Sequence, residues 1–121
     1  MRPHPGGQRW ERRAERYLQR QGLRTVERNF HCRLGEIDLV MRDGAVTVFV
    51  EVRYRRRSGF GRARESVTTA KQLKIARAAG IFLARQPELA QSPCRFDVLS
   101  IDGGTLPRIH WLKDAFQPES G

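Results

Sequence analysis

The chain lacks any apolar stretch that approaches the roughly 18 residues needed to cross a bilayer. Its first ten residues, MRPHPGGQRW, contain no apolar core of the kind that a secretory signal peptide needs. We therefore expect a cytoplasmic protein without membrane attachment. The two cysteines, Cys32 and Cys94, have no CxxC spacing and no histidine at zinc-ligand spacing, which predicts reduced thiols and argues against structural zinc.

Lysine is also scarce, because 20 of the 23 basic residues are arginine. The formal net charge of +10 points to a polyanionic partner, either nucleic acid or an anionic membrane surface. The planar guanidinium suits bidentate contacts with phosphate oxygens, although a GC-rich genome would produce the same bias. Charge also changes sign along the chain: residues 1–33 sum to +6, residues 34–52 to −3 and residues 53–77 to +8. This segregation favours a site where basic groups hold phosphates and acids have another task.

The length and the apolar periodicity predict one domain, residues 1–121, with flexible ends at 1–7 and 117–121. A helix is expected over 8–21, with an apolar stripe of Trp10, Ala14, Tyr17 and Leu18, and a second helix from about Ala70, started by a capping box at Thr69 and Gln72. Strands are expected over 24–31, 94–101 and 108–112, besides a central hairpin. The order α-β-β-β-α-β(-β) predicts an α/β fold, a central mixed β-sheet flanked by helices.

The hairpin is the clearest feature, because Asp43-Gly44 lies between the strand-forming runs GEIDLVM and VTVFVEVR. A turn centred there pairs Met41 with Val46, Leu39 with Val48, and Ile37 with Val50, so that one face is wholly apolar. Since a slip by one residue would scatter these side chains over both faces, the pattern predicts the register.

The other face of the same hairpin carries acids. The predicted register places Glu36 directly opposite Glu51, with Asp38 diagonal to Glu51. Two carboxylates about 6 Å apart repel by roughly 3 kcal/mol at an effective dielectric of 20. A bound divalent ion would offset this repulsion, and so would an ion-pair cluster formed by Arg53 and its neighbours.

Four segments of the chain resemble one known family. The strings GEIDLVMRDG, VFVEVRYR, SVTTAKQ and CRFDVLSI resemble the YraN-like family of small bacterial proteins (UPF0102), and the resemblance runs from about Gly7 to Phe116. That family is similar to archaeal Holliday junction resolvases within the PD-(D/E)xK, restriction-endonuclease-like superfamily. The resemblance implies a nuclease-like domain that hydrolyses phosphodiesters of branched DNA with the help of Mg²⁺, for which Mn²⁺ is a possible substitute.

The resemblance also implies a site. The catalytic residues would be Glu11, Asp38, Glu51 and Arg53, with Asp38, Glu51 and the backbone carbonyl of Val52 as metal ligands. Glu11 would anchor a ligand water or a second ion. Arg53 stands where the superfamily has lysine, and a guanidinium stays protonated, so it can hold a phosphate but cannot readily accept a proton.

Other residues would support this site. The basic residues Arg55, Arg56, Arg57, Arg62 and Arg64, with Lys71, would bind the DNA backbone by charge. Glu36 and Gln72 are auxiliary candidates, although a strand-end acid and a capping residue explain them as well. Dimerisation is expected by analogy with junction resolvases, which act as two-fold assemblies.

Two further functions stay open at this point. Because Arg53 replaces lysine, the same fold would also suit a catalytically silent nucleic-acid-binding module, which positions DNA or RNA for a protein partner that the sequence does not identify. The net charge alone would suit a basic protein associated with RNA or the ribosome, in which the acids have no function.

Overall fold

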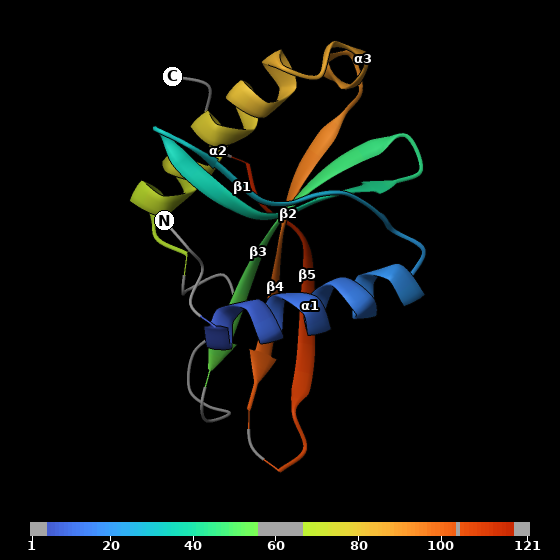
Figure 1. The fold of residues 1–121 in the computed structure, drawn as a ribbon, viewed down its shortest axis with the longest axis vertical. Coiled ribbons are helices and arrows are strands. Elements are labelled where there is room, and N and C mark those ends of the chain that lie inside the picture. The colour runs from blue at the N-terminus through green and yellow to red at the C-terminus, as the bar shows by residue number, and fades with distance from the viewer. Residues whose placement is uncertain (1–4, 56–66, 104, 118–121) are drawn as a thin grey trace.

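In a computed structural model, residues 5–55, 67–103 and 105–117 are described, with side chains from Arg9 onward (Figure 1). The elements follow the predicted order, and the α/β fold class is confirmed. They are α1 (Pro5–Arg20), β1 (Arg24–Cys32), β2 (Gly35–Asp43), β3 (Val46–Arg55), α2 (Thr69–Ala84), α3 (Pro87–Ala90), β4 (Cys94–Asp102) and β5 (Arg108–Phe116).

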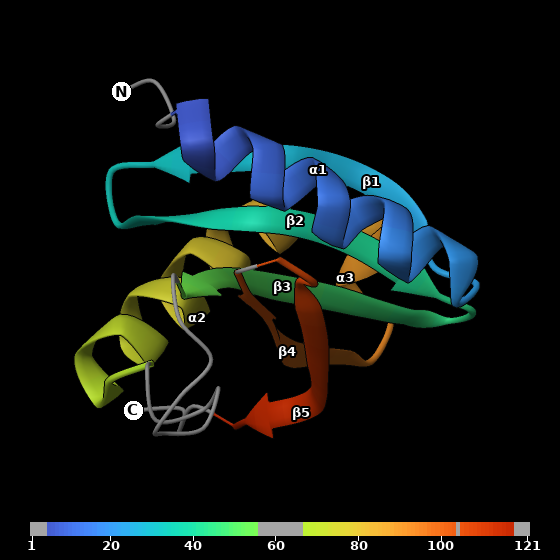
Figure 2. The same ribbon diagram turned by 90° about the horizontal axis from the view of Figure 1, so that it is seen from below.

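The five strands form one mixed sheet in the order β1-β2-β3-β4-β5. Only the pair β3 and β4 is parallel, and the segment with α2 and α3 connects these two strands. Such a crossover is what a parallel pair requires. Figure 2 shows α1 and α2 on opposite sides of the sheet, and none of the helices in the described ranges is long and apolar enough to span a membrane.

Two apolar cores hold these layers together, one on each side of the sheet. The predicted stripe of α1 is confirmed, because its residues pack in the α1 core. The buried members of the α1 core are Ala14, Leu18, Leu23, Leu39, Met41, Val48, Val50, Leu99 and Ile101, with Trp10 and Tyr17 at its margin. The α2 core contains Phe30, Ile37, Val40, Phe49, Val67, Ile75, Ala78, Ala79, Phe82 and Val98.

The predicted register of the central hairpin is wrong by two residues. Asp43 pairs with Val46, so the loop residues are Gly44 and Ala45, and Leu39 faces Val50. Gly44 has a φ of +61°, which suits the first loop position of a type II′ turn, where glycine is favoured. A two-residue shift keeps every side chain on its face, so apolar alternation, with its period of two, does not detect it.

The single apolar face predicted for this hairpin is also wrong at one position. Leu39 packs in the α1 core, whereas Ile37, two residues earlier, packs in the α2 core beside its strand partner Phe30. Between them the β1–β2 pairing passes over Asn29 and Asp38, and Asn29 has a left-handed φ of +52°. The strand β2 therefore reverses its faces at this point, whereas β3 keeps Val48 and Val50 in the α1 core, and Asp38 lies at the reversal.

The start of α2 differs from the prediction by one residue. Thr68, not Thr69, is the N-cap, and its hydroxyl accepts a hydrogen bond from the backbone N–H of Lys71 at 3.1 Å. The amide of Gln72 donates to the carbonyl of Val67 at 3.1 Å. Gln72 thus fastens the segment that leads into α2 but forms no capping box, and its auxiliary role stays a prediction.

Two element boundaries extend beyond the predicted ranges. The helix α1 begins at Pro5 instead of residue 8, because proline in the first turn loses only an N–H that has no helical partner. The strand β5 continues to Phe116, past Asp114, whose φ of +51° departs from strand geometry. The periodicity of RIHWL alone does not reveal this continuation.

The left-handed backbone at Asn29 generates a stability prediction. We expect Asn29→Ala to be less stable than Asn29→Gly by about 1 kcal/mol, because a Cβ atom is strained at positive φ and both variants lose the same amide. Urea unfolding of the two variants measures the difference.

His31, also in β1, provides the matched control, because it pairs regularly with Glu36 and has no left-handed φ. At ordinary strand geometry glycine is worse than alanine by roughly 0.5–1 kcal/mol, so the order of the two variants should invert there. If Ala and Gly rank in the same order at positions 31 and 29, the backbone of Asn29 is not the reason for the face reversal.

Candidate functional site

A notch opens where β2 separates from β3. The described pairing of these strands ends at Leu39 and Val50, and its register, if extended, would set Asp38 opposite Glu51. Instead of a backbone carbonyl, Oδ2 of Asp38 accepts the N–H of Val52 at 2.8 Å. The prediction that Glu36 faces Glu51 is therefore wrong, and the acid on that side of the notch is Asp38.

Glu36 lies at the rim of the notch. It pairs with His31 in the β1–β2 ladder, where its Oε2 lies 3.1 Å from Nδ1 of the histidine. Its side chain is largely exposed, as expected of a strand-end acid. Its charge nevertheless reaches the site, because it helps to raise the pKa of Glu11.

Glu51 is buried, with 5% of its surface exposed, and two cations approach it. Lys71 Nζ lies 2.9 Å from its Oε2, and a guanidinium nitrogen of Arg53 lies 3.3 Å from the same oxygen. An uncompensated buried carboxylate is costly, and these two contacts offset that cost at Glu51. Lys71 belongs to the first turn of α2, so the helix on one side of the sheet delivers a charge to an acid of the sheet.

Asp38 has a pKa raised well above its ordinary value. Burial is the largest cause, and the negative charge of Glu51 adds to it. The hydrogen bond from the Val52 N–H lowers the pKa, the charge of Glu11 raises it, and Lys71 lowers it. The response of Asp38 to Glu51, Glu11 and Lys71 shows that these three groups and Asp38 share one electrostatic environment.

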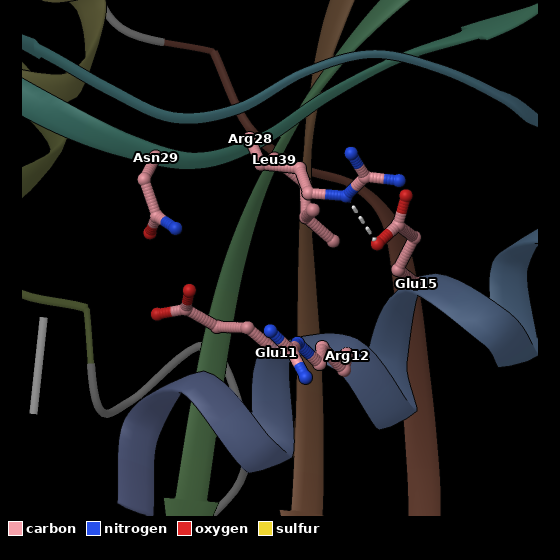
Figure 3. A pocket seen from close by; sticks show the side chains of 6 residues that line it. All are labelled: Glu11, Arg12, Glu15, Arg28, Asn29 and Leu39. Carbon is pink, nitrogen blue, oxygen red and sulfur yellow. Dashed lines mark hydrogen bonds and ion pairs between the residues drawn. The ribbon is translucent and has the colours of Figure 1, made fainter. Parts of the chain in front are cut away.

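Glu11 reaches the same place from α1. Burial is the largest cause of its raised pKa, a hydrogen bond with Asp38 lowers it, and the charges of Glu36 and Glu51 raise it. Its Oε1 is the one buried side-chain oxygen or nitrogen in the described residues that has no hydrogen-bond partner. Figure 3 shows the carboxylate facing the amide of Asn29 across a hollow of about 80 Å³, which has room for water.

The donor set of the notch fits Mg²⁺. This ion takes oxygen ligands, needs only one or two protein carboxylates and keeps several waters. Asp38 and Glu51 would hold it, and the unpartnered oxygen of Glu11 would accept a hydrogen bond from one of its waters. No group of three or more His, Cys, Asp or Glu side chains that would hold a metal ion occurs in the described ranges. The candidate protein ligands are therefore these two carboxylates and the predicted backbone carbonyl of Val52. When bound, Mg²⁺ would activate water and offset negative charge on a phosphate.

The remaining predicted site residues divide into three groups. Lys71, predicted as a phosphate contact, lies at the acids themselves. Arg55 lies at the end of β3, where its backbone oxygen accepts the N–H of Gly103 at 2.6 Å. Its contact with DNA and the role of the Val52 carbonyl as a metal ligand stay predictions. The predicted phosphate contacts Arg56, Arg57, Arg62 and Arg64 lie outside the described residues.

Sequence reasoning missed a second buried acid, Glu15. Its carboxylate receives hydrogen bonds from Nε of Arg28 at 2.8 Å and from the hydroxyl of Thr25, and Figure 3 shows the first of these. Burial alone would raise its pKa, but the bonds from Arg28 and Thr25 outweigh burial, and the pKa is lowered. Glu15 lies off the apolar stripe of α1, and its partners come from β1, so no local pattern indicates the contact.

The crowding of acids generates a prediction for Asp38. Above its raised pKa, Asp38 is ionised in the folded protein at a cost that the unfolded chain does not have. We expect Asp38→Asn, whose amide oxygen still accepts the Val52 N–H, to be more stable than the parent protein at pH 8 by about 1 kcal/mol or more. The gain should shrink as the pH falls through the raised pKa, and disappear below the ordinary value of 3.8, where both states are protonated. Denaturant unfolding in EDTA at several pH values measures it.

Asp43→Asn is the control for this prediction. Asp43 forms an ion pair with Arg95 at 3.0 Å, so its removal should bring no gain at pH 8. A loss of stability in Asp38→Asn at pH 8, equal to that of the control, would mean that repulsion among the acids is not significant.

Comparisons with known proteins identify the chain's relatives. Residues 10–101 match the uncharacterised protein family UPF0102. A UPF0102 protein of Halorhodospira halophila is 51% identical over 118 residues, which cover 98% of this chain and 92% of that protein. UPF0102 proteins of Alkalilimnicola ehrlichii and Pseudomonas savastanoi pv. phaseolicola are 53% and 52% identical over 110 and 105 residues, covering 91% and 85% of this chain and 85% of each relative. The chain belongs to the protein family UPF0102.

Proposed function

We propose that this protein is a divalent-metal-dependent endonuclease that acts on structured, branched DNA. One observation carries the proposal: Glu11 from α1, Asp38 from β2 and Glu51 from β3 share one notch, and the pKa values of Glu11 and Asp38 are raised within it. Acids that the fold holds together against their mutual repulsion are typical of a site that binds a cation. The similarity to junction resolvases supplies the choice of branched DNA.

Each side chain then has a separate role. Asp38 and Glu51 hold the metal ion, and Glu11 accepts a hydrogen bond from water beside it. Lys71 and Arg53, which flank Glu51 in the free protein, offer positive charge to the scissile phosphate. Since lysine is able to exchange a proton and arginine is not, Lys71 takes the role that the strand lysine has in related nucleases.

A second function is favoured by one specific observation. Glu51 is already neutralised by Lys71 and Arg53, which is the ion-pair alternative to a metal ion. If that pairing persists in the presence of Mg²⁺, the protein is a nucleic-acid-binding module without catalysis. The two functions share a binding surface and differ only in what the acids do.

Cleavage assays with labelled junction, flap and linear DNA test the first function. We expect cleavage of branched substrates with Mg²⁺ or Mn²⁺ and none in EDTA. Asp38→Asn and Glu51→Gln should each reduce the rate by at least about 10²-fold, since each removes a metal ligand, while binding measured in EDTA persists. Asp43→Asn, an acid outside the notch, should retain the parental rate.

Two outcomes of these assays would contradict the proposed nuclease. Intact binding by the parent protein and by both variants, with no metal-dependent cleavage of any substrate, would establish the silent module. A rate that is equal in Asp38→Asn and in the parent protein would point to a contaminating nuclease and overturn the proposal.

The two cations at Glu51 generate a separate prediction. We expect Lys71→Ala to reduce cleavage by at least about 10²-fold, and Arg53→Lys to stay within a few-fold of the parent protein. Single-turnover rates across a pH series measure both effects. If Arg53→Lys restores cleavage in the Lys71→Ala background, the proton-exchanging role does not belong to Lys71 alone. If Lys71→Ala leaves the cleavage rate unchanged, Lys71 has no such role.

A further inference from the structure

A groove runs from the notch between the β1–β2 turn and the first half of α2. Its volume is about 670 Å³, within the range of sites that hold a ligand of drug size. The residues that line it come from the end of β1, the turn, the start of β2, the N-cap of α2 and α2 itself.

The two walls of this groove touch at its base. A Cβ atom placed on Gly35 would lie 2.9 Å from the backbone oxygen of Lys74, so the turn approaches α2 closely at this glycine. The α2 core holds the same elements together through Phe30, Ile37 and Ile75. The groove is therefore a fixed feature of the packing between the hairpin and the helix.

The charges of the groove are suited to an anion. Arg33 and Lys74 are exposed and form no ion pair with other described residues. Lys71 also lines the groove, where it is paired with Glu51, and the one acid of the lining, Glu36, lies against His31. Exposed basic side chains at the walls bind phosphates without selecting a sequence.

Part of the lining of the groove is apolar, which narrows the choice of occupant. Leu34 is 40% exposed, and Cys32, Ala70 and Ile75 line the same groove. A duplex presents its phosphates on the outside and keeps its bases stacked within, whereas an unpaired strand offers the apolar faces of its bases as well. A groove whose lining is both basic and apolar is therefore better matched to a single strand.

The groove is continuous with the acids of the notch. Lys71 lines the groove, and its Nζ lies 2.9 Å from Oε2 of Glu51 in the notch. We propose that the groove binds an unpaired DNA strand and leads it to the notch. This inference rests on the proposed function, and it adds that the preferred branched substrates are those with a single-stranded arm.

The two cysteines of the protein make a direct test possible. Cys32 lies in the groove, whereas Cys94 is exposed at the start of β4, where it pairs with Thr47 and lines no part of the groove. Saturating oligodeoxythymidine in EDTA should slow the alkylation of Cys32 several-fold and leave that of Cys94 unchanged, as read by mass spectrometry. Equal rates at Cys32 with and without the oligonucleotide would overturn the proposal.

Charge reversals test the same groove by affinity. Arg33→Glu and Lys74→Glu should each weaken the binding of oligodeoxythymidine by about 10-fold and reduce the salt dependence by about one phosphate contact, with a smaller effect on a blunt duplex. Arg24→Glu makes the same charge change at the opposite end of β1, and it should have little effect. An equal loss of affinity in all three variants, for both DNA forms, would mean that binding depends on the net charge of the protein and not on this groove.

The outcomes separate this inference from the proposed function. Protection of Cys32 without metal-dependent cleavage would keep the groove and reject the nuclease. Cleavage that depends on Asp38, with no protection of Cys32 and no preference for flaps over blunt junctions, would keep the nuclease and reject the groove.

Discussion

The hydrogen bond from the Val52 N–H to Asp38 is the contact on which the candidate site depends. In a continuous ladder a backbone carbonyl would take that N–H, and the two strands would stay paired. Because a carboxylate takes it, β2 can leave β3 without orphaning a buried donor, whose loss would cost about 1–3 kcal/mol. The separation of the strands creates the notch. The hydrogen bond from Val52, which permits this separation, also fixes Asp38 inside the notch.

The electrostatics of the notch follow from this arrangement. Asp38 is held in a place that raises its pKa, and Glu51, almost directly across from it, is buried and needs compensation. Lys71 and Arg53 supply it, but they reach Glu51 and not Glu11, whose Oε1 has no partner in the described part of the chain. The compensation is therefore unequal between Glu51 and Glu11.

The sequence predicted most of the architecture, because its main signals are local. The stripe of α1 and the alternation in β2 and β3 reflect burial, which each element records in its own residues. The register of the hairpin was missed because a shift of two residues leaves burial unchanged. That shift decides which acid lies opposite Glu51. The local pattern therefore predicted that the acids share a face of the sheet, but not which of them are paired.

Other parts of the site depend on contacts between distant segments. Lys71 reads as one more basic residue of a helix, and only the packing of α2 against the sheet places it at Glu51. Glu15 is stabilised by Arg28 and Thr25 on β1, which no periodicity of α1 indicates. Asn29 reads as an ordinary strand residue, although its backbone is left-handed and lies where β2 reverses its faces. This reversal sends Ile37 to the α2 core and keeps Leu39 in the α1 core, so that Asp38 lies where the two sides of the sheet meet. A carboxylate at that position interacts with Glu11 of α1 and with Lys71 of α2. A residue within a regular ladder faces only one side of the sheet and would not interact with both helices.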